Sequence, residues 1–87
     1  MKCIWKYILG PYSEQSLQIP KDSTILSVDS QGSKLCLWAM VDPDKTKEYR
    51  VFEVFGTGLS IPPGNRTFIG TCKLDNDTMI FHVFEKH

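Results

Sequence analysis

The residues best suited to hold a ligand gather around one glycine-rich loop. Gly56-Thr57-Gly58 opens a loop that runs to Thr67, and the only two arginines of the chain, Arg50 and Arg66, flank it. Successive backbone N–H groups in such a turn can hold an anion, and a guanidinium group matches phosphate through two parallel hydrogen bonds. The spacing therefore predicts a cationic hollow that binds phosphate. A glycine-rich turn with two solvated arginines is the alternative that the pattern leaves open.

Aromatic side chains near this loop could stack a nucleotide base. Trp38 lies inside an apolar run and is also suited to core packing, whereas Trp5 belongs to an amphipathic segment and Tyr49 precedes Arg50 directly. The complete predicted ligand-binding set is Arg50, Gly56, Thr57, Gly58, Arg66, Trp5, Trp38 and Tyr49.

No catalytic group emerges from the sequence. There is no serine in a nucleophile-elbow setting, no H-E-x-x-H and no cysteine or histidine spacing of a metal site. His82 alternates with apolar residues, which favours a hydrogen-bonded structural histidine. Asp75-Asn76-Asp77 lacks the glycine and distal glutamate of a calcium loop, so a hairpin turn is the better interpretation. We expect a protein that is not an enzyme and uses no metal or cofactor.

These residues are carried by short apolar segments. The run from Leu35 to Val41, closed by Asp42-Pro43, is typical of a strand buried on both faces. Further strands are predicted at 2–9, 15–19, 24–28, 49–55, 68–74 and 78–85. With turn signals every 8–12 residues and no helix of normal length, the pattern predicts a single all-β domain over residues 1–87. Its predicted architecture is a compact antiparallel sandwich or barrel of about seven short strands.

Composition restricts the partners. Ten basic and ten acidic residues give a formal net charge of zero, which argues against binding to duplex nucleic acid or to an anionic membrane. Cys3, Cys36 and Cys72 each lie in an apolar run, as expected for reduced thiols, and neither a signal peptide nor a membrane span is evident. We therefore expect a cytoplasmic protein. A core from 87 residues is small, so a homo-oligomer is also expected.

Two blocks carry a family resemblance. Cys36 to Pro43 (C-L-W-A-M-V-D-P) and Phe81 to Glu85 (F-H-V-F-E) resemble a family of small uncharacterised proteins of tailed bacteriophages and prophages. The resemblance implies an accessory protein that acts in the host bacterial cytoplasm against anti-phage defence. By analogy with other small β-rich phage proteins, it would sequester a nucleotide immune signal, of the cyclic nucleotide or ADP-ribose type. A protein-binding inhibitor of a host defence protein, or a phage structural or assembly adaptor, is the alternative.

Overall fold

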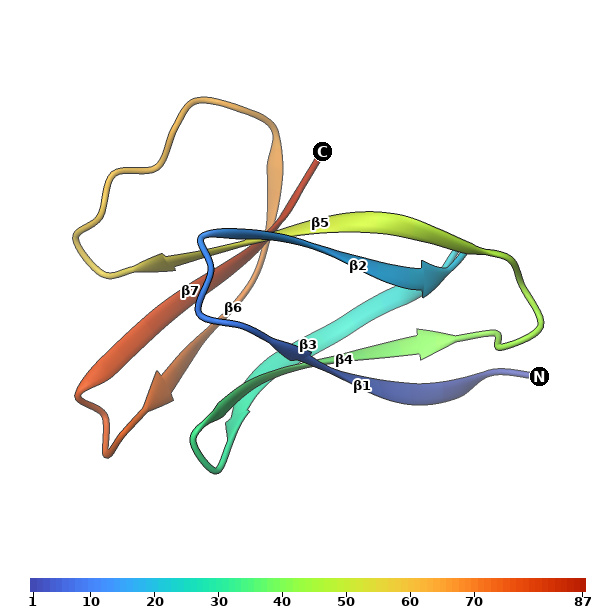
Figure 1. Ribbon diagram of the computed structural model, residues 1–87, viewed down its shortest axis with the longest axis horizontal. Helices are drawn as coiled ribbons and strands as arrows, with labels where there is room; N and C mark the ends of the chain where they lie inside the picture. The colour runs from blue at the N-terminus through green and yellow to red at the C-terminus, as the bar shows by residue number, and fades with distance from the viewer.

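The computed structural model describes residues 1–87 and contains seven strands and no helix, so no helix could cross a membrane (Figure 1). The strands are β1 (Cys3–Leu9), β2 (Glu14–Pro20), β3 (Thr24–Gln31), β4 (Lys34–Val41), β5 (Lys47–Gly56), β6 (Arg66–Leu74) and β7 (Met79–Lys86). All pairings are antiparallel, in a three-stranded sheet of order β1-β4-β3 and a four-stranded sheet of order β2-β5-β7-β6. The predicted all-β fold is confirmed, as two packed sheets and not as a closed barrel.

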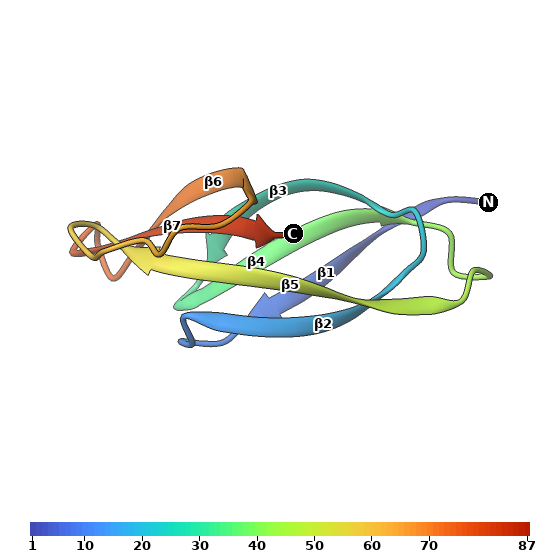
Figure 2. The same ribbon diagram turned by 90° about the horizontal axis from the view of Figure 1, so that it is seen from above.

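The two sheets approach each other most closely along one side. There β3 and β6 pack together without a hydrogen-bonded ladder, at the upper side of Figure 2. Gly70 of β6 lies so near Val28 of β3 that a Cβ atom on Gly70 would be 2.9 Å from Val28 Cγ2. On the other side, the edge strands β1 and β2 are connected by a turn but have no ladder between them. The sandwich is therefore tight on one side and open on the other.

Alternation along each strand selects the core. In β4, Leu35, Leu37, Ala39 and Val41 point to the four-stranded sheet and are buried against Phe52 and Val83. The opposite face of β4 carries Cys36, which is buried, and Trp38 and Met40, which are half-buried. The prediction that β4 is buried on both faces therefore holds for the inner face and for Cys36, whereas Trp38 and Met40 on the outer face are half-buried.

Several boundaries differ from the sequence prediction. β5 begins at Lys47, inside a stretch of polar residues, because Lys47 and Glu48 pair with Pro20 and Ile19 of β2. β3 continues to Gln31 because the hairpin with β4 extends to its turn, where Gly32 has a φ of +63°. The expected tight turn at Asp75 to Asp77 is present, with φ values of +51°, +55° and +67°.

Candidate functional site

Arg50 is held inside the sandwich by a carboxylate. It lies on the core-facing side of β5, two residues before the fully buried Phe52. Its Nε donates to Glu85 Oε2 at 2.6 Å, its Nη2 donates to Glu85 Oε1 at 2.7 Å, and its Nη1 donates to the main-chain oxygen of Ser23 at 2.6 Å. The hydrogen bonds to Glu85 raise the pKa of Arg50 above its ordinary value, although burial acts in the opposite direction.

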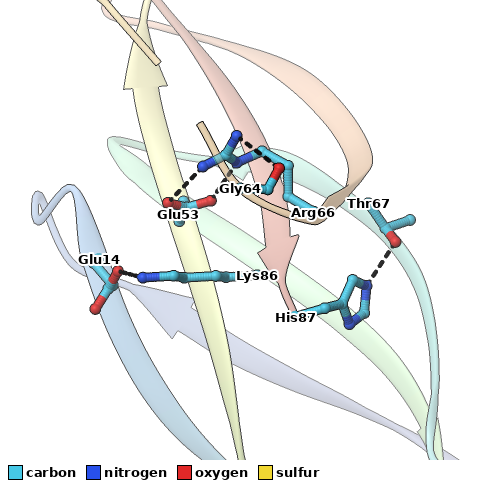
Figure 3. Close-up of polar contacts among 7 residues, drawn as sticks. All are labelled: Glu14, Glu53, Gly64, Arg66, Thr67, Lys86 and His87. Atoms are coloured by element: carbon cyan, nitrogen blue, oxygen red, sulfur yellow. Dashed lines mark hydrogen bonds and ion pairs between the residues drawn. The ribbon is translucent and has the colours of Figure 1, made fainter. Parts of the chain in front are cut away.

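Arg66 is paired in the same manner on the other side of the four-stranded sheet. Its Nε donates to Glu53 Oε1 at 2.7 Å, and its guanidinium carbon lies 5.9 Å from the centre of the Phe55 ring. Figure 3 shows this group folded over Glu53 at the base of the 57–65 loop. Only 12% of the Arg66 side chain and 6% of the Glu53 side chain are exposed, so this ion pair is largely shielded from solvent.

The predicted cationic hollow is therefore not formed. Arg50 shares the inner face of β5 with Phe52, whereas Glu53, which holds Arg66, is on the outer face, because successive side chains of a strand point in opposite directions. The structure does not bring the two arginines together. In each arginine, the pair of donors formed by Nε and one Nη already faces a carboxylate, so a two-point phosphate contact through those atoms would have to replace the internal ion pair.

The glycine-rich turn is present but is tied to a histidine. Leu59 N donates to Gly56 O at 3.2 Å, and Gly58 has a φ of +88°, which favours glycine. Thr57 Oγ1 lies 2.8 Å from His82 Nε2, and Thr71 Oγ1 lies 2.9 Å from His82 Nδ1. Both ring nitrogens of His82 are thus occupied by hydroxyl groups, and no carboxylate contacts the ring. These two contacts attach the turn to β6 and β7. They could not be predicted from the sequence, because Thr57, Thr71 and His82 are far apart in the chain.

The three aromatic residues of the predicted site are also dispersed. Trp5 packs against the core from β1, with Lys47 Nζ 6.0 Å from its ring centre. Trp38 lies on the outer face of the three-stranded sheet, and Tyr49 is 70% exposed on the outer face of the four-stranded sheet. None of them shares a pocket with Arg50 or Arg66.

The main concave feature is a cavity of about 690 Å³ at one end of the sandwich. Figure 1 shows on its left the turns and the strand end that supply its lining residues. The β1–β2, β3–β4 and β6–β7 turns and the end of β5 surround this end cavity. Its walls are mainly apolar and include Leu9, Leu35, Val54, Leu74, Met79 and Phe81. Gly56 lines it too, and is the member of the predicted set that reaches it. Its volume is in the range of small-molecule sites, although it is a half-open hollow and not an enclosed cavity.

Exposed apolar side chains concentrate around the end cavity. Ile8, Tyr12, Leu59 and Met79 line it and are 44–67% exposed, and they are four of the ten large hydrophobic side chains left exposed on the molecule. Lys34 and Asp75 also line it, and neither has an ion-pair partner within 4.0 Å. Single exposed apolar residues are ordinary, whereas these four share one concave surface.

The Tyr12 side of the cavity mouth is held in a fixed shape. Gln15 Oε1 accepts a hydrogen bond from Gly10 N at 2.8 Å, and Gln15 Nε2 donates to Gly10 O at 3.1 Å. The Tyr12 ring lies directly against Gly10, where a Cβ atom would be 2.8 Å from two ring carbons. Glycine at position 10 therefore allows Tyr12 to lie at the mouth.

A second cavity, of about 320 Å³, adjoins the first and shares Ser13, Val54 and Leu59 with it. This side cavity lies under the 57–65 loop, and its remaining lining residues are Glu14, Glu53, Phe55, Ser60 and Pro62. Across the whole chain, no three His, Cys, Asp or Glu side chains are grouped so that they could hold a metal ion. The two cavities contain no cysteine or histidine, and their polar side chains are serines, Tyr12, one lysine and three carboxylates.

Comparison with known families gives one match. Residues 1–87 match a family described as Domain of unknown function (DUF7352). Among curated proteins and solved structures, no match was found.

Proposed function

The chain belongs to the DUF7352 family, a domain of unknown function, and we propose that it is a non-catalytic binding protein that holds a small, mostly apolar molecule in the end cavity. The observation that carries this proposal is the coincidence of an apolar cavity of about 690 Å³ with exposed Ile8, Tyr12, Leu59 and Met79. A bound ligand would cover apolar surface that water otherwise contacts.

The expected affinity follows from the area that a ligand can bury. A bicyclic aromatic molecule that loses ~300 Å² of apolar surface gains roughly 7 kcal/mol at ~25 cal/mol per Å². Loss of translational and rotational freedom reduces this gain. The net gain is therefore much smaller than the burial alone supplies, and we expect weak binding of a simple apolar probe and tighter binding of the natural ligand.

Sequestration of a nucleotide immune signal, by a homo-oligomer acting against host defence, stays a prediction of the sequence. That prediction required two arginines free to bind phosphate, whereas in the structure Arg50 pairs with Glu85 and Arg66 pairs with Glu53. Lys34 is the single cation in the end cavity, which is little for a ligand with two or more phosphates. A nucleotide is therefore not the ligand class that the geometry favours, and titration with cyclic nucleotides and ADP-ribose tests it directly.

One observation favours a second function, binding to a protein. β1 is an edge strand of the three-stranded sheet, and its side chains Ile4 and Ile8 are 60% and 50% exposed. Lys6 lies between them on the same face. The free backbone donors and acceptors of an edge strand can accept a strand from another chain. A protein inhibitor or assembly adaptor would use this edge, and a charge at Ile4 (Ile4→Lys) would abolish its complex without changing the end cavity.

Fluorescence titration with N-phenyl-1-naphthylamine, a neutral apolar probe that brightens when it leaves water, tests the cavity proposal. Wild-type protein is expected to bind one probe. Gly56→Phe places a ring in the cavity, where the only nearby side chain is that of Leu59, 3.4 Å from the new Cβ position. We expect this variant to lose at least ten-fold in affinity.

The matched control is Ser16→Phe, which adds the same ring on an exposed position of β2 outside both cavities. It should bind the probe as wild type does. Absence of binding to wild type, or equal binding by both phenylalanine variants, would contradict the proposal.

A further inference from the structure

The four edge strands of the two sheets are not alike. β3 and β6, which pack against each other, each contain a register shift, at 25–27 in β3 and at 68–70 in β6. β1 and β2 lie on the other side of the sandwich, called here the open side, and each pairs with its neighbour over seven residues without a shift. Local irregularities protect an edge strand from pairing with another chain. β1 and β2 lack this protection.

The open side also leaves part of the core accessible. In Figure 1, β1 and β2 lie in front and run in opposite directions, and no ladder connects them. Trp5 and Tyr7 of β1 and Leu17 of β2 pack against the core here but are only half-buried. The open side therefore combines two free backbone edges with apolar side chains between them.

The ladder of β2 shows which of its backbone groups are free. Just beyond the two ends of β2, Ser13 O accepts a hydrogen bond from β5 at 3.0 Å, and Lys21 N donates to the residue before β5 at 2.9 Å. Hydrogen-bonded pairs recur at every second residue of an antiparallel ladder, so the odd-numbered residues of β2 direct their N–H and C=O groups to β5. The N–H and C=O groups of Ser16 and Gln18 consequently point away from the sheet.

We propose that the open side is the interface of a homodimer, in which β1 of each copy pairs with β2 of the other. A two-fold axis parallel to the strands produces both antiparallel pairings at once, because β1 and β2 of one chain run in opposite directions. Each three-stranded sheet then continues into the four-stranded sheet of the second copy. This inference does not rest on the proposed function of the end cavity.

Charge favours this pairing over a pairing of β1 with β1. Lys6 is the middle residue of β1, so a full antiparallel pairing of two β1 strands would place the two lysines directly opposite each other. Like charges in that position are destabilising. β2 contains no lysine or arginine, so it accepts β1 without this repulsion.

The open side is large enough for a stable dimer. Such an interface takes about 800 Å² from each partner, about one seventh of the 5640 Å² accessible surface of this chain. Figure 1 views the molecule along its shortest axis, so the open side extends over the two longer dimensions, 39 and 31 Å.

Analytical ultracentrifugation of the full chain, from micromolar to millimolar concentration, tests the inference. We expect a species of twice the 9.9 kDa mass of one chain. Gln18→Pro removes an outward N–H and leaves the ladder with β5 intact. Since two-fold symmetry then removes one hydrogen bond from each joined ladder, the dissociation constant of the dimer should rise about ten-fold or more. Gln18→Ala, which keeps the N–H at the same exposed position, is the matched control and should dimerise as wild type does.

Hydrogen exchange of the wild-type amides gives a readout that needs no substitution. The amides of Ser16 and Gln18 should exchange slowly in concentrated protein and much faster after dilution. A monomer over the whole concentration range overturns the inference and leaves both edges to a strand of another protein. A dimer whose Ser16 and Gln18 amides exchange fast, or one that a folded Gln18→Pro variant does not weaken, uses another surface and overturns it as well. If Gln18→Pro does not fold, the wild-type exchange rates decide alone.

Discussion

Substitution of Arg50 by methionine distinguishes a structural arginine from a ligand-binding one. Arg50→Met keeps most of the side-chain volume but leaves the carboxylate of Glu85, whose side chain is 11% exposed, without its partner. The main-chain oxygen of Ser23 also loses its donor. Because a buried charge without a partner is costly, we expect the free energy of unfolding to fall by about 3 kcal/mol, the lower end of the usual range, since 20% of the Arg50 side chain is exposed.

This loss can be converted into a shift of the thermal midpoint. Unfolding entropy is roughly 2.1 cal/mol/K per residue, which for the 87-residue chain gives about 0.18 kcal/mol/K. A loss of about 3 kcal/mol thus lowers Tm by about 16 °C. Differential scanning calorimetry, with urea unfolding monitored by tryptophan fluorescence, measures both quantities.

A double-mutant cycle supplies the control. Arg50→Met/Glu85→Leu removes both charges and should recover at least half of the loss, because no unpaired charge remains in the double variant. Lys86→Met breaks the exposed pair with Glu14 and should leave Tm nearly unchanged. If Arg50→Met is as stable as wild type, the pair does not contribute as described and the arginine is free for another role.

Three further predictions concern the contact between β3 and β6, the buried thiol of Cys72 and the opening of the end cavity. Gly70→Ala puts a Cβ atom 2.9 Å from Val28 Cγ2, so the free energy of unfolding, measured with urea, should fall by about 1–3 kcal/mol. Val28→Ala should restore part of this loss. An unchanged urea midpoint would show that β3 and β6 are not in close contact. Burial raises the pKa of Cys72 from 9.0 to about 11, so the unfolded chain releases this proton first and stability should fall as pH rises from 9 toward 11, by about 2 kcal/mol at pH 11. Cys72→Ala should remove most of this fall in stability between pH 9 and pH 11. If the variant loses stability with pH as wild type does, the thiol of Cys72 is not buried. Gly10→Ala displaces the Tyr12 ring and should weaken probe binding several-fold with little change in Tm, whereas unchanged binding would exclude Tyr12 from the site.

Alternation along the chain was sufficient to predict most of the fold. The runs that became β1 and β7 show it clearly, β4 was marked by a continuous apolar run that ends at Asp42-Pro43, and the turns at Gly32 and Asp75 to Asp77 were marked by their residue types. The same alternation places Arg50 on one face with Phe52 and Val54. A charged residue on a buried face needs a partner, so the sequence already contained a reason to expect an internal ion pair.

The ion-pair partners of Arg50 and Arg66 and the end cavity could not be predicted from the sequence. Glu85 is 35 residues from Arg50 and Glu53 is 13 residues from Arg66, and only the pairing of β5 with β7, and of β7 with β6, brings them together. The end cavity is built from three turns and the end of β5, which lie far apart in the chain. Proximity in sequence suggested that both arginines served the loop between them, and the tertiary structure assigned each to a different face.

The most direct test of the account is to locate the bound apolar molecule. Two-dimensional ¹H–¹⁵N NMR spectra, recorded while N-phenyl-1-naphthylamine is added, report which amides it affects. We predict shifts confined to the turns and strand ends around the end cavity, including Leu9, Leu35 and Leu74, with the Nε signals of Arg50 and Arg66 unmoved. Shifts centred on either arginine, or no saturable shift at all, would contradict the assignment of the end cavity as the binding site.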